Sequence, residues 1–211
     1  MRAQVTQSRW HISPLMKAPR EKAKAGGLFT LFLHHHFERT PGLTKLEYAC
    51  CAEIMGRVFW AAQTMNCRSP ETGNIELLSI YANAEQMARW LELLLKGELF
   101  SAYSMTKPNV VSADAMNISF PMDKVGVEYV LNGGKIVSSV FWNPEIKLYI
   151  LMARAGPQNE NRWRRRSRVL VPSDSPGLTI TRNVSIIGYD HATGRVWQGL
   201  VLNKKEWKRS Q

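Results

Sequence analysis

The sequence has few cysteines and no long apolar run. It contains three cysteines in 211 residues, and two of them, Cys50 and Cys51, are adjacent. They make neither a disulfide framework nor a Cys-x-x-Cys metal pair, so we expect reduced packing residues in an intracellular protein. The longest apolar cluster, residues 28–33, is shorter than the roughly 18 residues that a membrane span requires. The sequence therefore predicts no transmembrane segment.

The common signatures of nucleotide and hydrolase sites are also missing. Neither a Gly-x-Gly-x-x-Gly loop nor a Walker sequence is present, and no Gly-x-Ser-x-Gly elbow occurs. Three consecutive histidines stand at 34–36, but neighbouring positions diverge on a helix or a strand and do not converge on one metal ion. We therefore expect no metal site, and spacing nominates no catalytic residue.

The net charge of +11 is concentrated at the two ends of the chain. Residues 1–26 carry +5, residues 27–159 carry −1 and residues 160–211 carry +7. A basic groove on a folded surface needs charge interleaved with the elements that build it. We therefore expect solvated basic flanks and no specific nucleic-acid site. An alternative stays open, in which the chain is a non-enzymatic interaction protein whose basic tails bind a partner or an acidic surface.

Helical patterns occupy residues 43–97. Thr44 with Glu47, and Asn83 with Gln86, have the spacing of capping boxes, which start helices. An apolar stripe at steps of four follows the first box and predicts a packed helix over 45–60. The stripe consists of Leu46, Cys50, Ile54 and Val58. A short helix over 73–82 and a longer one ending at Gly97 complete a predicted antiparallel helical bundle.

After about residue 100 the period of the pattern changes from 3.6 to 2. The strand Glu128 to Leu131 runs into Asn132-Gly133, a dipeptide that favours a type I′ hairpin, so a return strand is predicted from Lys135. Further strands are predicted at 147–152, 168–171 and 178–180. The predicted fold class is α+β, with an N-terminal helical bundle followed by a small antiparallel β-barrel or sheet domain.

Three segments at and after this seam carry a family resemblance. They are AYSMTKP (102–108), SADAMNI (112–118) and EYVLNGGK (128–135), and TGNIELL (72–78) and LVPSDSPGLTI (170–180) support them. Together they resemble the acyl-CoA dehydrogenase family, in particular its large vertebrate members, over roughly residues 20–192. The predicted domains are a basic leader (1–26), a partial N-terminal helical domain (27–100), a middle β-domain (101–192) and a basic tail unlike the family (193–211).

The resemblance implies an FAD-dependent oxidation of the Cα–Cβ bond of an acyl-CoA, in which the flavin performs the chemistry and the protein positions it. The residues that it implies for the cofactor are Tyr103, Met105, Thr106, Ser112, Val137 and Ser138, with Ala113 toward the acyl-CoA. It also implies a mitochondrial or peroxisomal location, with a cytoplasmic one left open, and a homo-oligomer or association with full-length family members.

Some positions depart from the family pattern. Lys107 stands where the family has Glu, Ala113 replaces a Ser, and Ile136 replaces an aromatic Trp that packs on the flavin. The family's catalytic carboxylate belongs to a second helical domain that we expect this chain to lack. The chain alone is therefore expected to be weak or inactive, with no catalytic residue of its own, and its tail suggests an alternative exon or a shifted reading frame.

Overall fold

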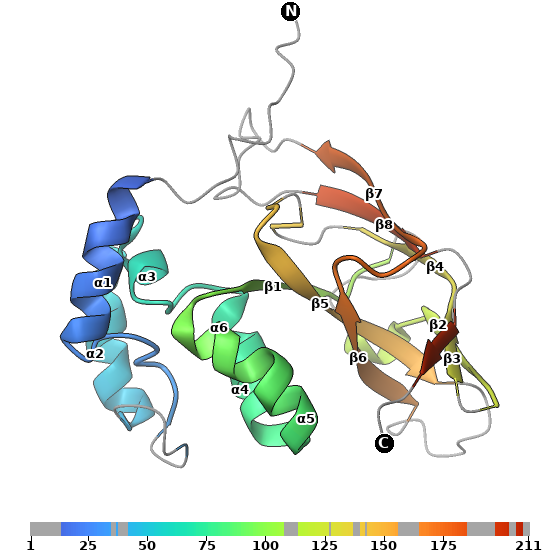
Figure 1. Ribbon diagram of the computed structural model, residues 1–211, viewed down its shortest axis with the longest axis horizontal. Coiled ribbons are helices and arrows are strands. Elements are labelled where there is room, and N and C mark those ends of the chain that lie inside the picture. Colours follow the sequence, from blue (N-terminus) through green and yellow to red (C-terminus); the bar gives the residue numbers. More distant parts are fainter. Residues whose placement is uncertain are drawn as a thin grey trace, which may run out of the picture. The chain divides into compact units, whose positions relative to one another are not determined.

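The computed structural model divides into two compact units. It describes residues 14–34, 37, 42–107, 114–126, 128–136, 140–141, 143–155, 165–184, 197–202 and 206–208, and from 181 onward the backbone alone. The helical unit ends at Phe100 and the sheet unit begins at Ser101 (Figure 1). Among the described residues, no helix has the length and apolar character needed to cross a membrane.

The helical unit contains six α-helices in its described part. They are α1 (Lys17–Ala25), α2 (Lys45–Gly56), α3 (Ala61–Thr64), α4 (Glu71–Tyr81), α5 (Ala84–Gln86) and α6 (Glu92–Lys96), with a 3₁₀ turn at Pro14–Met16 and a π-helical turn at Met87–Leu91. α5, the π-helical turn and α6 follow one another without a break and form one helical stretch. Gly97 ends that stretch in the left-handed conformation, with φ of 65°.

Both predicted capping boxes are confirmed. The Thr44 hydroxyl accepts from the Glu47 amide at 3.3 Å, and the Thr44 amide donates to the Glu47 carboxylate at 2.7 Å. At the second box the Asn83 side chain accepts from the Gln86 amide at 2.8 Å, while the Asn83 amide donates to the Gln86 side chain at 3.1 Å. These local signals set the starts of α2 and α5.

The apolar stripe predicted to pack α2 is wrong. Leu46, Ile54 and Val58 are 79%, 64% and 41% exposed, and Met55 is the buried residue of the helix. Each step of four residues turns about 40° around a helix with 3.6 residues per turn, so the stripe winds away from a single face. The core of the unit instead uses Leu33, Ile75, Leu78, Leu91 and Leu94.

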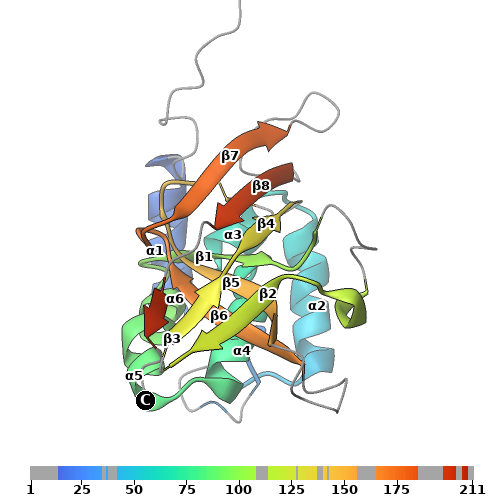
Figure 2. The same cartoon turned by 90° about the vertical axis from the view of Figure 1, so that its right-hand side faces the viewer.

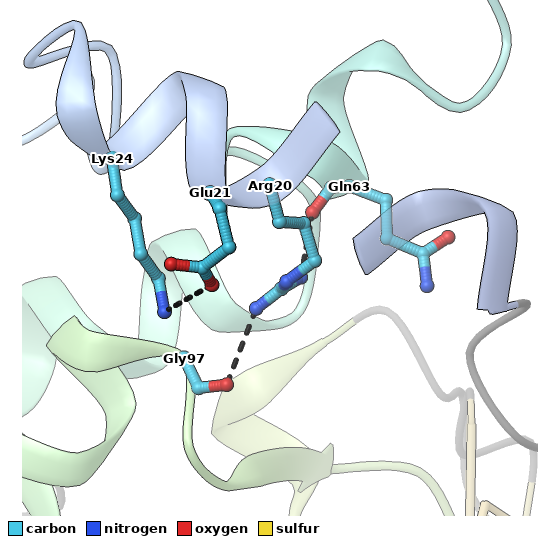
Figure 3. A network of polar contacts seen from close by, with 5 residues as sticks. All are labelled: Arg20, Glu21, Lys24, Gln63 and Gly97. Carbon is cyan, nitrogen blue, oxygen red and sulfur yellow. Dashed lines mark hydrogen bonds and ion pairs between the residues drawn. The ribbon is translucent and has the colours of Figure 1, made fainter. Parts of the chain in front are cut away.

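Part of the predicted leader belongs to the helical unit. Residues 17–25 form α1, in which Arg20 and Ala23 are buried. The Arg20 guanidinium donates to the Gln63 carbonyl at 3.0 Å and to the Gly97 carbonyl at 3.2 Å (Figure 3). It also lies 5.4 Å from the ring centre of Phe29. Arg20 therefore joins α1 to α3 and to the residue that ends α6, so residues 17–25 form a helix packed within the helical unit.

The sheet unit contains two sheets in its described part. The first has the order β1-β5-β2-β3-β9, with β6 pairing β5, and the second has the order β4-β8-β7 (Figure 2). The strands are β1 (Phe100–Ser104), β2 (Pro121–Val125), β3 (Glu128–Leu131), β4 (Gly133–Lys135), β5 (Ile146–Ala155), β6 (Arg166–Pro172), β7 (Leu178–Val184), β8 (Trp197–Leu202) and β9 (Glu206–Lys208).

The first sheet is mixed, whereas an antiparallel one was predicted. β2 pairs β5 in parallel, while the β2–β3 and β5–β6 pairs are antiparallel. The parallel pair joins strands that are distant in sequence, and alternation within a strand carries no information on the direction of such a partner. The α+β class holds, with helices first and a curled, mixed sheet after them.

The hairpin predicted at Asn132-Gly133 is wrong. β3 pairs β2 through the turn at Gly126, whereas β4 pairs β8 in the other sheet. Asn132 lacks the positive φ that a type I′ turn requires, and Gly133 has φ of 142°. A Cβ at Gly133 would lie 3.3 Å from the Phe120 ring, so glycine lets the chain pass close to this ring between the sheets.

The predicted basic tail also takes part in the sheets. β8 pairs β4 and β7, and β9 pairs β3. Glu206, which was expected in a solvated tail, lies in β9 opposite Val130. Residues 197–202 and 206–208 of this segment therefore belong to the sheets.

Candidate functional site

The end of β1 carries the described part of the predicted flavin site. Ala102 and Ser104 are buried, whereas Tyr103, Met105 and Thr106 are half-buried. Tyr103 lies on the face of β1 opposite Ala102 and Ser104, and Met105 and Thr106 continue the accessible segment beyond the end of the strand. The other predicted residues, Ser112, Ala113, Val137 and Ser138, lie outside the described residues.

Two contacts hold the segment after β1 against the segment after β4. The Thr106 hydroxyl donates to the Ile136 carbonyl, and the Ile136 amide donates to the Thr106 carbonyl at 3.2 Å. Residues 105–107 lie beyond β1 and Ile136 lies beyond β4. Ile136 directly precedes Val137, so two segments predicted to contact the flavin, one at Thr106 and one after Ile136, lie side by side.

A buried lysine that was not predicted from the sequence lies beneath this segment. Lys135 is 0% exposed, and its Nζ donates to the carbonyl of Met105 at 2.7 Å and to that of Met152 at 2.6 Å. Burial, with a smaller contribution from the charge of Lys107, lowers the pKa of Lys135 to about 7. The sequence carries no signal for this burial, because β4 is only the three residues Gly133–Lys135 and has no alternating pattern.

Lys107, the charge that departs from the family pattern, has a partner in the sheet unit. Its Nζ donates to the Ser119 carbonyl at 3.0 Å. Partial burial lowers the pKa of Lys107 below its ordinary value. The side chain thus ties the segment after β1 to the segment before β2, which gives this lysine a structural role beside the predicted flavin strand.

A polar pocket of about 340 Å³ opens between β5, β6 and residues 114–118. Arg154, Arg165 and Arg166 line it, and Arg166 donates to the Met116 carbonyl. The Asp114 carboxylate accepts from the Met116 amide at 2.7 Å and so begins the 3₁₀ turn Ala115–Asn117. Arg165 and Arg166 were expected in a solvated flank, but both are half-buried. Three guanidinium groups at one pocket favour an anionic ligand.

The described residues contain no cluster of three or more histidine, cysteine, aspartate or glutamate side chains suited to a metal ion. They do fit part of a flavin site. The half-buried side chains of Tyr103, Met105 and Thr106 form an accessible segment at the end of β1, which suits contact with a planar ring. The hydrogen-bonded Thr106 also has its hydroxyl oxygen fixed in place by Ile136.

No family model matches the chain, but curated proteins and solved structures do. The chain is 42% identical over 199 residues to acyl-CoA dehydrogenase family member 10 of Mus musculus, which covers 92% of this chain and 18% of that protein. It is 39% identical over 184 residues to acyl-CoA dehydrogenase family member 11 of Gallus gallus, covering 87% and 23%. The chain thus spans about a fifth of the length of these relatives.

Solved structures agree with these relatives. A structure described as a putative acyl-CoA dehydrogenase of Mycobacterium abscessus has a TM-score of 0.89 at 38% identity, covering 98% of this chain and 50% of that one. A glutaryl-CoA dehydrogenase of Mycobacterium smegmatis in complex with FADH2 has a TM-score of 0.66 at 17% identity, covering 92% and 46%. The second likeness concerns the fold alone. The helices followed by a curled sheet match the first structure over half of its chain.

Proposed function

We propose that this chain, which belongs to the acyl-CoA dehydrogenase family and spans part of the length of its relatives, binds FAD at the end of β1. In this proposal it contributes the flavin-contacting part of a site that oxidises the Cα–Cβ bond of an acyl-CoA. The observation that carries the proposal is the accessible segment at the end of β1, in which Tyr103, Met105 and Thr106 are half-buried and Thr106 is hydrogen-bonded to Ile136.

FAD would supply the acceptor for the hydride that leaves the acyl group. The role of this chain is to orient and shield the ring. Tyr103 and Met105 supply apolar surface for it, and Thr106 offers its hydroxyl oxygen and backbone to the pyrimidine edge. Val137 and Ser138 follow Ile136 directly in sequence, so the proposal assigns them to the same edge. Ser112 would contact the flavin from the next segment, and Ala113 the acyl-CoA.

The arginine pocket supports an anionic substrate such as an acyl-CoA, whose nucleotide end carries phosphates. Arg154 is exposed, while Arg165 and Arg166 are half-buried beside residues 114–118. That segment directly follows Ala113, the residue proposed to face the acyl-CoA. Guanidinium groups bind phosphate oxygens in pairs, which suits recognition of such a ligand.

Titration of the purified chain with FAD tests the cofactor proposal. We expect saturable quenching of flavin fluorescence, and Thr106→Ala to weaken the affinity by about 1 kcal/mol or more, the scale of one hydrogen bond. Thr179→Ala, at an exposed position of β7, is the matched control and should bind like the wild type. Absence of binding by the folded wild-type chain would refute the proposal, and equal affinity of Thr106→Ala would place the flavin elsewhere.

A further inference from the structure

The buried ammonium group of Lys135 connects strands of both sheets. Lys135 is the last residue of β4, in the second sheet, while Met152 lies in β5 of the first sheet. The Nζ atom donates to the carbonyls of Met105 and Met152, at 2.7 and 2.6 Å. One side chain therefore fixes the segment after β1 relative to two strands.

The surroundings of Nζ match the three donors of an ammonium group. Two carbonyl oxygens accept two of these hydrogen bonds. Nζ also lies 4.9 Å from the ring centre of Phe120, and the face of an aromatic ring attracts cations. A neutral amine would keep two N–H groups, but its hydrogen bonds would lose their charge assistance. Its lone pair would also turn toward the negative face of the ring. The geometry of Lys135 thus suits the protonated form.

Met105 is the point at which this lysine meets the proposed flavin strand. Residue 105 lies just beyond the end of β1, and Lys135 supplies its carbonyl with a donor from the buried side. The neighbouring Thr106 is held by Ile136, which follows Lys135 in sequence. The backbone of Met105 and Thr106 is therefore set by residues 135 and 136 together.

We propose that Lys135 is a positioning residue of the flavin site, whose ammonium group holds the Met105 carbonyl so that the affinity for FAD follows the charge of this side chain. This inference rests on the proposed function, and Lys135 itself does not touch the cofactor. It acts through the backbone that carries Met105 and Thr106, which the proposal places against the ring.

The charge of Lys135 changes within the accessible pH range. Burial and the positive charge of Lys107 lower its pKa to about 7 in the free chain. On the neighbouring elements, the Tyr103 hydroxyl of β1 donates to the Met152 sulfur at 3.5 Å, and the Tyr149 hydroxyl of β5 donates to the Phe141 carbonyl. The charged residues of β5, Lys147 and Arg154, are exposed. The protonated amine holds the Met105 carbonyl by a charge-assisted hydrogen bond, so the affinity for FAD should fall as pH rises through this region.

The test is an FAD titration between pH 6 and pH 8.5 with the whole chain and two variants. For the wild type we expect the affinity to fall roughly tenfold across this range, the scale of one charge-assisted hydrogen bond. Lys135→Met removes the donor, so its affinity should be about tenfold lower at pH 6 and independent of pH. Lys124→Met removes an exposed charge of β2 and should keep the wild-type profile.

Amide hydrogen exchange supplies a measurement without the cofactor. In Lys135→Met the Ile136 amide should exchange faster, because the Thr106 carbonyl that it meets is less firmly held, while the Leu170 amide in β6 stays unchanged. If Lys135→Met does not fold, Lys107→Gln replaces it. This variant removes the neighbouring charge and should move the midpoint of the wild-type pH profile upward.

The outcomes separate the two proposals. An affinity for FAD that is pH-independent in the wild type, or equal in Lys135→Met, overturns the role of Lys135 and leaves the flavin site standing. An unchanged midpoint in Lys107→Gln, or unchanged Ile136 exchange in Lys135→Met, also overturns it. A folded wild-type chain that binds no FAD at any pH overturns both proposals.

Discussion

Replacement of Arg20 by alanine should destabilise the helical unit by more than a typical substitution in a helix at the protein surface. Arg20 is 6% exposed, and its two terminal nitrogens donate to the Gln63 and Gly97 carbonyls. The guanidinium also lies 5.4 Å from the ring centre of Phe29 and 5.6 Å from that of Phe100. The substitution removes all four contacts and leaves two carbonyls that must find other donors.

The size of the loss follows from these contacts. A hydrogen bond from a charged donor contributes about 1.5–3 kcal/mol, and a cation–π contact about 0.5–1 kcal/mol. Recovery of the hydration of a buried guanidinium offsets part of the sum. We therefore expect a loss of about 2–4 kcal/mol in the free energy of unfolding for Arg20→Ala. Arg20→Lys keeps one charge without the forked donors and should lose about half as much.

Gly97 allows the contact to be located by a double-mutant cycle. A Cβ at this position would clash with the Arg20 guanidinium and would lie 2.9 Å from the Phe29 ring, in addition to the strain of a positive φ. Gly97→Ala should therefore cost more in the wild type than in Arg20→Ala, where one clash is gone. We expect a coupling of about 1 kcal/mol or more between the two substitutions.

Urea unfolding of the whole chain, followed by far-UV circular dichroism, measures these free energies. Lys22→Ala, at an exposed position of α1, is the control and should change stability by less than about 0.5 kcal/mol. A loss below about 1 kcal/mol in Arg20→Ala, or strict additivity with Gly97→Ala, would refute the reasoning. Either result would mean that the guanidinium does not join α1 to α6 in solution.

Three further predictions follow from burial and charge. Leu94→Ala, at a fully buried site, should cost about 2–5 kcal/mol in urea unfolding, whereas Ile54→Ala should cost less than about 0.5 kcal/mol; equal losses would contradict the exposure of α2. The pKa of Lys135 is lowered to about 7, so between pH 7 and 9 the unfolded chain binds a proton that the folded chain has lost. The free energy of unfolding of the wild type, minus that of Lys135→Met, should then rise with pH by up to about 1.4 kcal/mol per pH unit. A difference that stays constant or falls would refute the lowered pKa. Calorimetric titration with coenzyme A should show weaker binding in Arg154→Gln than in Arg168→Gln, an exposed control in β6, and the same affinity in both would exclude the pocket as its site.

What could be read from the sequence depends on whether a signal is local. The capping boxes at Thr44 and Asn83 involve residues three apart, and both exist as predicted. The Asn132-Gly133 turn is also a local signal, but the pairing of β4 with β8 and the Phe120 ring beside Gly133 decide the path there. The turn preference of a dipeptide does not decide the structure where strands distant in sequence pair with the same backbone groups.

The candidate site shows the same division. Resemblance implied Tyr103, Met105 and Thr106 as one short flavin-contacting segment, and that assignment stays a prediction. The burial of Lys135 could not be predicted, because it depends on acceptors 30 and 17 residues away, in Met105 and Met152. The arginine pocket likewise needs the pairing of β5 with β6, which brings Arg154 opposite Arg166.

The burial of β5 on both faces has a consequence for the chain before it folds. From Leu148 to Ala153 every side chain is buried, so this strand is one uninterrupted apolar stretch, LYILMA, without charge or proline. Such a stretch is prone to intermolecular strand pairing while it is unprotected. Lys147 and Arg154 flank it and are exposed, in the positions where charged residues limit this kind of aggregation. Neutralising both flanking charges should therefore lower the yield of soluble protein on refolding, at a given protein concentration, with little effect on the stability of the folded chain.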